Sequence, residues 1–383
     1  MVCDVDIGTA DATRIHTVEV ARWLAAEGFA VELVVRGPDP ALTGVRLRSA
    51  GPRDVMLLRR ILGVNGRAIA TLVRQRRRGR ACYVRQYWTL VPTILAARAL
   101  GYRVVAQVDN IHHGQGPKRK TGVRDALAER FRNLALRIMG RCAAGIVAVK
   151  DGIAATLVRD FGIDPAKVRV IPNGVDVEVI RPVVRSEAIE ESKLDPSCRY
   201  VIFIGNIAGW VDFDTMLRAF AAAAETRPQA RLLLVGDGPK RPSVEALIAE
   251  LGIGDRVLLT GYVMDRDRMR NLLGAATVCT IAYRPDEIGE LGVAPVKLAE
   301  YLAAGRAVVT TDVIGAREMV EGNGAGVAVP PGVGAMAEAL GRLLDDPEAA
   351  DEMGRAGRRA AEKRYTWRSV VERTLPLLLK RAS

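Results

Sequence analysis

The feature that most restricts the fold of this 383-residue chain is a regular alternation of short β-branched strands with helical segments. Successive strands joined by helices must be parallel, because the chain has to cross over before it can pair again. We therefore expect an α/β protein with helices on both faces of parallel sheets. The second half has the clearest pattern, with predicted strands at 200–204, 230–235, 257–260, 277–281 and 307–310 and predicted helices at 213–226, 241–251 and 265–275.

The length favours two domains, since 383 residues are too many for one ordinary α/β core. A Pro172-Asn173-Gly174 turn, followed by a polar stretch at 181–199, marks a boundary. We expect a first domain at 1–178, a second at 179–364, and a last helix at 365–383. That last helix is long enough to pack back on the first domain.

Composition excludes several classes of protein. No uninterrupted apolar run is long enough to cross a membrane, and the first residues do not resemble a signal peptide, so we expect a cytoplasmic protein. Peripheral attachment at the inner face of the membrane stays open. The five cysteines are odd in number and scattered, without paired or metal-ligand spacing, so we expect them to be reduced and structural. We expect no metal site, and no cofactor to be required.

The positive charge is concentrated in the first half. Residues 1–176 hold 29 Lys and Arg against 15 Asp and Glu, a net +14, whereas the whole chain carries +12. Basic runs at 74–80 and 118–141 suggest an anionic membrane, an anionic acceptor or nucleic acid as partner. With only 5% aromatic residues and no recognition module, we expect no nucleic acid.

The stretch 291–310 combines a glycine loop, a helix and a strand. We expect the helix to start at Pro295 and to stop at Gly305, with its positive end facing the loop of Gly292, Val293 and Ala294. Lys297 and Glu300 share a face of that helix. This combination suits a nucleotide sugar, although an ordinary surface ion pair explains the two side chains equally well.

Other candidate residues lie in loops that follow predicted strands. Gly236, Asp237 and Gly238 form a strand-to-helix turn that lets backbone approach a ligand, and a plain tight turn explains it as well. The loop from Gly8 and Thr9 to His16 follows the first strand. All three histidines fall in such loops, which favours a site, although ordinary surface histidines would also fit: His16, His112 and His113.

Together these segments resemble the GT-B glycosyltransferases, in particular the retaining family 4 type. The resemblance rests on motifs in a fixed order: Ile-Pro-Asn-Gly-Val-Asp at 171–176, Leu-Val-Gly-Asp-Gly-Pro at 234–239, Glu-Tyr-Leu-Ala-Ala-Gly at 300–305, Val-Pro-Pro-Gly at 329–332 and Tyr-Thr-Trp at 365–367. It implies two facing Rossmann-like domains, the first binding the acceptor and the second binding the nucleotide sugar.

The resemblance also implies roles for single residues. Glu300 matches the glutamate that holds the nucleotide ribose, Gly236 the glycine turn beside the donor, and Tyr262 with Val263 the segment lining the base. The loop from Asp109 to His113 would lie opposite the donor sugar. We therefore assign His113, with His112 as alternative, a polar contact to that sugar, and Asp109 to the acceptor side.

Two departures from the family pattern affect the donor site. Gly292 stands where the first glutamate of the motif is usual, and Asn206 begins a stretch, 206–212, that lacks the usual Arg and Lys diphosphate clamp. A cation is still required, and Lys297, then Arg284, is our candidate.

We expect metal-independent transfer with retention, from a UDP- or GDP-sugar to a lipid-linked saccharide or a small-molecule acceptor. A nucleotide-sugar epimerase and a non-catalytic nucleotide-sugar-binding protein are the alternatives.

Overall fold

The computed structural model describes residues 1–7, 12–37, 42–51, 57–77, 81–85, 88–111 and 123–379. The chain forms two compact units. Unit 1 comprises Met1–Gly174 and Trp367–Ser383, and unit 2 comprises Val175–Thr366. The sequence predicts these boundaries at 178/179 and 364/365.

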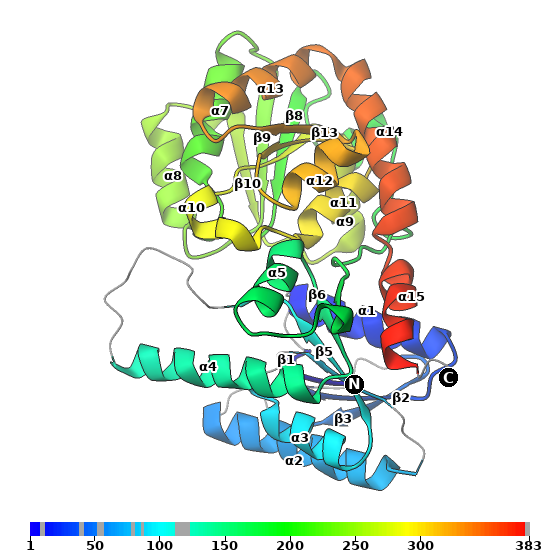
Figure 1. The fold of residues 1–383 in the computed structure, drawn as a ribbon. Helices are drawn as coiled ribbons and strands as arrows, with labels where there is room; N and C mark the ends of the chain where they lie inside the picture. Colours follow the sequence, from blue (N-terminus) through cyan, green and yellow to red (C-terminus); the bar gives the residue numbers. More distant parts are fainter. Residues whose placement is uncertain are drawn as a thin grey trace. The chain divides into compact units, whose positions relative to one another are not determined.

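Unit 1 is built on a seven-stranded parallel sheet with the strand order β3-β2-β1-β4-β5-β6-β7 (Figure 1). Nearly every residue of its central strands is buried, as expected for a sheet covered on both faces. The strands are β1 (Val2–Asp6), β2 (Val31–Arg36), β3 (Val45–Ser49), β4 (Ala81–Arg85), β5 (Arg103–Val108), β6 (Gly145–Ala148) and β7 (Val168–Val170).

Two layers of helices cover the sheet of unit 1. One layer contains α1 (Ala12–Ala26) and the returning helix α15 (Trp367–Leu378), which contact each other. The other contains α2 (Leu57–Gln75), α3 (Val91–Ala99) and α4 (Val123–Cys142), with α3 touching both of its neighbours (Figure 1). A last helix, α5 (Asp151–Arg159), packs on β6 and β7.

Helix α15 belongs to the core of unit 1 although it is last in the chain. Trp367 is 2% exposed, and the hydrophobic cluster that holds it also contains residues of β1, β4 and β5. The Nε atom of Arg103 donates a 2.6 Å hydrogen bond to the carbonyl oxygen of Leu377. Gly174 lies so close to Trp367 that a Cβ would meet its ring at 2.7 Å.

Unit 2 is a second parallel sheet, of six strands in the order β10-β9-β8-β11-β12-β13. Together the two sheets give the α/β, two-domain architecture expected from the alternating pattern. The strands are β8 (Arg199–Ile204), β9 (Ala230–Val235), β10 (Val257–Gly261), β11 (Ala276–Ile281), β12 (Ala307–Thr311) and β13 (Gly326–Val329).

The helices of unit 2 include those predicted at 213–226, 241–251 and 265–275, and two other places differ from the prediction as follows. Residues 185–191, within the stretch read as a polar connection, form helix α6, which packs on α9. Pro295 is the residue before the helix, in an extended conformation (φ −77°, ψ 132°), and not its first residue. The helices are α6 (Arg185–Glu191), α7 (Phe213–Glu225), α8 (Arg241–Glu250), α9 (Arg266–Ala275), α10 (Pro285–Ile288), α11 (Val296–Ala303), α12 (Ala316–Val320), α13 (Val333–Asp345) and α14 (Pro347–Arg364).

No helix in the described part of the chain has the length and hydrophobicity needed to cross a bilayer.

Candidate functional site

The strand order of unit 2 creates a switch point between β8 and β11. From β8 the chain moves outward to β9 and β10, then returns to the other side of β8 to form β11, β12 and β13. The loops after β8 and β11 therefore leave the sheet in opposite directions. In open parallel sheets this is where ligands bind.

Backbone contacts tie the loops around this point together. The N–H of Asp212, after β8, donates to the carbonyl oxygen of Ala282, after β11, at 2.9 Å. Val211 and Tyr283 form an isolated bridge between the same two loops. The Tyr283 N–H also reaches the hydroxyl of Thr311 at the end of β12, at 3.1 Å. The carboxyl end of the sheet is thus a connected set of loops.

Glycines allow the loops after β8, β9 and β10 to approach each other. The N–H of Gly236 donates to the carbonyl oxygen of Gly261 at 2.9 Å, and a Cβ on Gly236 would lie 2.0 Å from the carbonyl oxygen of Gly205. Gly236 has φ +137°, a conformation that favours glycine. A Cβ on Gly238 would meet the Asn206 side chain at 2.2 Å. The predicted donor residues Asn206, Gly236 and Gly238 therefore lie together.

Asp237 has a structural role in this turn. Its carboxylate accepts a 2.7 Å hydrogen bond from the Gly238 N–H and pairs with Arg241 at 3.0 Å. It therefore fixes the turn to the first residue of α8.

The loop of Gly292, Val293 and Ala294 packs against the loop after β12. The N–H of Val293 donates to the carbonyl oxygen of Ile314 at 2.8 Å, so this N–H is satisfied within the protein. Gly292 has φ +68°, and a Cβ there would lie 2.6 Å from the same Ile314 oxygen. These contacts set the direction in which α11 begins.

Lys297 reaches from α11 to the loop after β8. Its Nζ lies 4.9 Å from the centre of the Phe203 ring and 2.5 Å from the position that a Cβ on Gly205 would take. Burial lowers the pKa of Lys297 to about 8, against the opposing effect of Glu300. No acidic side chain of the described residues forms an ion pair with this ammonium group.

Glu300 lies one turn further along α11. Burial raises the pKa of its carboxyl group, while Arg266 and Lys297 act in the opposite direction. Within the described ranges this carboxylate accepts no hydrogen bond and forms no ion pair. Lys297 and Glu300, both half-buried and neither paired among the described residues, therefore lie on α11 beside the loops at the carboxyl end of the unit 2 sheet.

The remaining donor candidates divide into two groups. Tyr262, 63% exposed, and Val263 follow β10 and precede Arg266, whose charge acts on Glu300. Arg284 instead precedes α10, 3.8 Å from Glu287, and lines a hollow of about 480 Å³ shared with residues of α7 and α8. Lys297 lies against Gly205 at the start of the loop after β8, whereas Arg284 shares its hollow with Gly209 and Val211 near the end of that loop.

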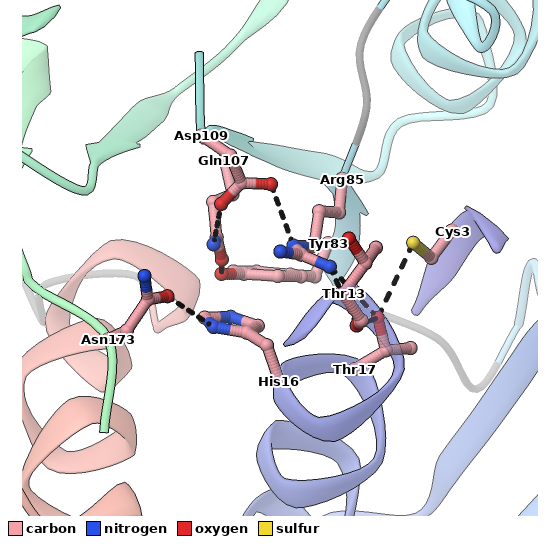
Figure 2. Close-up of polar contacts among 9 residues, drawn as sticks. All are labelled: Cys3, Thr13, His16, Thr17, Tyr83, Arg85, Gln107, Asp109 and Asn173. Carbon is pink, nitrogen blue, oxygen red and sulfur yellow. Dashed lines mark hydrogen bonds and ion pairs between the residues drawn. The ribbon is translucent and has the colours of Figure 1, made fainter. Parts of the chain in front are cut away.

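Unit 1 has its own switch point, between β1 and β4, and a polar cluster surrounds it (Figure 2). Arg85 ends β4, Gln107 lies near the end of β5, and Asp109 follows it. Asp109 accepts a 2.6 Å hydrogen bond from the Gln107 side chain and pairs with the Arg85 Nε at 2.8 Å. Burial alone would raise the pKa of Asp109, but Arg85 above all outweighs it and the pKa is lowered.

His16 joins this cluster from α1, not from a loop as the sequence analysis expected. Helix α1 already starts at Ala12. The ring is 2% exposed, and its Nδ1 lies 3.0 Å from the Asn173 side-chain oxygen, toward which it points (Figure 2). The Trp367 ring contacts it edge to face, with 5.0 Å between the ring centres. Burial, then Arg85, lowers the pKa of His16 to about 4, so the ring is neutral near pH 7.

Sequence reasoning missed several members of the unit 1 cluster. Arg85, Gln107 and Asn173 are polar residues at or just after buried strands, which is the only signal that pointed to them. Lys150 is another, with its pKa lowered to about 8 by burial. Four predicted residues lie outside the described part of the chain: Gly8, Thr9, His112 and His113.

Metal ligands do not gather in the part of the chain that the structure describes: no three His, Cys, Asp or Glu side chains there are close enough to hold an ion.

Two family models match the chain, one in each half. Residues 13–179 match the family described as Glycosyltransferase Family 4, and residues 198–346 match Glycosyl transferases group 1. The 2-deoxystreptamine glucosyltransferase of Streptomyces kanamyceticus is 27% identical over 90% of this chain and 92% of its own length. The alpha-D-kanosaminyltransferase of the same organism is 31% identical, over 44% of this chain and 42% of its own length, so the match spans less than half of that relative.

A comparison with solved structures supports the architecture of both units. The Anabaena protein Alr3699/HepE, solved in complex with UDP, superposes with a TM-score of 0.74 at 16% identity, covering 98% of each chain. At this identity the likeness shows the fold.

Proposed function

We propose, from the premise that this chain is a glycosyltransferase of the GT-B type, that it transfers a sugar from a nucleotide diphosphate sugar to an acceptor with retention of configuration and without a metal. One observation carries the proposal. Lys297 and Glu300, both unpaired among the described residues, stand on one face of α11 at the switch point of unit 2.

Lys297 supplies the charge that a departing diphosphate needs. An ammonium group in a partly desolvated position interacts with phosphate more strongly than one in water, and its charge is reinforced by the positive end of α11. It thereby takes the place of the Arg and Lys clamp missing from 206–212. Arg284 is the second candidate for the same role.

Glu300 holds the nucleotide. A carboxylate accepts hydrogen bonds from two neighbouring hydroxyls, which is the pattern of a ribose. Tyr262 and Val263, which precede Arg266 beside Glu300, would line the base, with Asn206, Gly236 and Gly238 at the phosphate side. The UDP bound to Alr3699/HepE supports a UDP-sugar as donor, with a GDP-sugar as the alternative.

Unit 1 receives the acceptor. Neutral His16 and ionised Asp109 both accept hydrogen bonds, and their neighbours hold them in place. Gly8 and Thr9 complete the acceptor side in this proposal, and His113, or His112, contacts the donor sugar. The name of the nearly full-length relative supports a small-molecule acceptor. A lipid-linked acceptor, with contact to an anionic membrane, is the alternative.

A thermal-shift screen tests the donor site. UDP, GDP, ADP and dTDP are added with and without magnesium to the wild type and to Glu300→Ala, with Glu338→Ala, an exposed acid on α13, as matched control. A ligand that binds only the folded state raises the melting temperature. We expect one nucleotide to stabilise the wild type and the control, independently of magnesium, and to lose its effect in Glu300→Ala.

The outcomes separate the alternatives. A nucleotide that stabilises the protein while no sugar reaches any acceptor would indicate the non-catalytic binding protein. Conversion of the donor into its epimer without an acceptor would indicate the epimerase. No shift with any nucleotide would contradict the donor site itself.

A further inference from the structure

Exposed apolar side chains are concentrated on one helical layer of unit 1. Of the fifteen large apolar residues that are exposed in the described chain, eight lie on α2, α3 and α4. These three helices form one continuous layer, since α3 contacts both of the others (Figure 1). The eight are Leu57, Leu58, Leu62, Val73, Leu95, Leu127, Phe131 and Leu134.

Helix α4 carries three of them in a single stripe. Leu127, Phe131 and Leu134 are spaced four and three residues apart, so they lie above one another on one face of the helix. They are 59%, 52% and 55% exposed. Leu136 and Met139, which are buried, point in a direction roughly a third of a turn or more away. The stripe is therefore not the edge of the core.

Arginines border this stripe on the side away from the core. Arg130 and Arg137 follow Leu127 and Leu134 by three residues each, and Arg141 continues the same row; all three are exposed. The acidic residues of the helix, Asp125 and Glu129, project from the opposite side of the circle. Positive charge thus accompanies the apolar stripe, and negative charge does not.

Helix α2 repeats the arrangement. Leu58 and Leu62, four residues apart, are 66% and 64% exposed, whereas Val64, Ala68 and Leu72 point into the core. Exposed Arg59, Arg67 and Arg74 accompany them along the helix. Apolar and basic side chains therefore share the outer surface at both ends of the layer.

We propose that this leucine–arginine surface, formed by the exposed residues of α2, α3 and α4 named above, docks unit 1 on an anionic lipid bilayer. Apolar side chains enter the acyl boundary while neighbouring arginines contact lipid phosphates. This inference identifies a surface for the membrane contact considered above, and it does not depend on the transfer reaction.

The charge pattern argues against two other occupants. A second copy of the chain would face this surface with its own arginines, and like charges repel across a symmetric interface. Nucleic acid would use the arginines but would leave the leucine stripe in water. A bilayer with anionic headgroups satisfies both kinds of side chain.

Vesicle co-sedimentation tests the proposal with the full-length protein. Phosphatidylcholine vesicles with and without phosphatidylglycerol are compared for the wild type, for the triple variant Leu127→Ser, Phe131→Ser, Leu134→Ser, and for Arg130→Gln with Arg141→Gln. The control variant Val184→Ser with Leu258→Ser removes two exposed apolar side chains from unit 2. Melting temperature and the nucleotide-induced shift verify that each variant is folded, and light scattering gives the oligomeric state.

We expect the wild type and the control to bind only the vesicles that contain phosphatidylglycerol, and less strongly as salt is raised. Both surface variants should bind at least about tenfold more weakly with an unchanged nucleotide shift. Equal binding by the triple variant, or no binding by the wild type, would overturn the proposal. A wild-type dimer that the triple variant converts to monomer, without lipid binding, would assign the surface to a second copy. Loss of the nucleotide shift in Glu300→Ala leaves these outcomes unaffected, so the two proposals fail separately.

Discussion

Lys297 gives the donor site a pH dependence of its own. Its pKa is lowered to about 8 by burial, so the free protein begins to lose this charge just above neutral pH. A bound diphosphate favours the charged form of Lys297. Above about pH 8, binding of the ligand is therefore coupled to the uptake of a proton by Lys297. We expect nucleotide affinity to fall as pH increases from 8 to 10, by up to about tenfold per pH unit, and titration calorimetry at several pH values measures it.

Lys297→Met provides the comparison. This variant should bind nucleotide weakly at every pH, with the slope above pH 8 removed. A slope that persists in Lys297→Met would transfer the role to another cation, and Arg284→Met would then be the variant to examine.

His16 makes the stability of the protein depend on pH in the acidic range, whereas Lys297 acts above pH 8. Its pKa is about 4 in the folded protein against 6.5 for an ordinary histidine, because burial and Arg85 disfavour the imidazolium. The unfolded chain therefore takes up a proton below pH 6.5 that the folded protein refuses until about pH 4. This histidine should therefore lower the free energy of unfolding by about 3 kcal/mol as pH decreases from 6.5 to 4, and its contribution should be constant above pH 6.5. Urea denaturation of the wild type and of His16→Gln measures the difference.

The control for His16 is the way in which the difference in the free energy of unfolding between wild type and His16→Gln varies with pH. His16→Gln should lose stability at pH 7 through its contacts with Asn173 and Trp367, yet the gap to the wild type should narrow as pH falls. A difference in stability between wild type and His16→Gln that does not change with pH would mean that His16 takes up its proton at the same pH in the folded protein as in the unfolded chain.

Residue-level features were predictable where spacing along one helix decides them. Lys297 and Glu300 share a face because they are three positions apart, and the structure places them so. Arg85, Gln107 and Asn173 come from strands far apart in sequence, so no local pattern connects them. The polar residues before His16 predict a loop, whereas in the structure α1 starts at Ala12 and the Thr17 hydroxyl donates to the Thr13 carbonyl oxygen at 2.8 Å.

At the scale of elements, the loops after β8, β9 and β10, where the proposed donor residues lie, are held together by backbone contacts that only glycine permits. Gly236→Ala would place a Cβ 2.0 Å from the Gly205 carbonyl oxygen, at φ +137°, and would push the loops after β8 and β9 apart. We expect a loss of about 1–3 kcal/mol in the free energy of unfolding, together with weaker nucleotide binding. Denaturant unfolding and the thermal-shift assay measure the two effects.

Gly254→Ala is the matched control for that glycine. A Cβ at Gly254 meets no atom within 4 Å, so we expect little change in stability and none in nucleotide binding. Normal nucleotide binding by Gly236→Ala would show that the two loops can separate without harm to the site.

Elements were predictable where the hydrophobic period is strong. The predicted strand at 230–235 agrees with the structure residue for residue, and those at 200–204, 257–260, 277–281 and 307–310 each differ from it by one residue at one end. The elements that sequence analysis omitted are weak in this respect. Strand β3 is an edge strand that alternates valine and leucine with arginine, α3 contains Pro92, and α6 has only seven residues. The short helices α10 and α12, of four and five residues, are further omissions. Tertiary packing, and not local preference, determines these elements.

At the scale of the whole molecule, the alternation of strands and helices predicted two parallel sheets, but it could not give their strand order. That order, with a switch point in each sheet, is what brings the loops of each site together. The path of the chain matters equally, because the chain enters unit 2 at Val175 and returns to unit 1 at Trp367. The stability of unit 1 therefore depends on residues that follow unit 2 in the sequence.

This path predicts two separable unfolding transitions in calorimetry. Trp367→Ala removes a 2% exposed ring from the core of unit 1, beside Gly174 and His16, and should cost that unit about 3–5 kcal/mol. Nucleotide, bound by unit 2, should raise only the other transition, by about 2.7 kcal/mol at a hundredfold excess over Kd. Phe131→Ala, which truncates an exposed ring of unit 1, should move neither. If Trp367→Ala and nucleotide shift one common transition, the two units unfold together. The packing of α15 would then stabilise the unit that holds the donor site as well as the unit that holds the acceptor site.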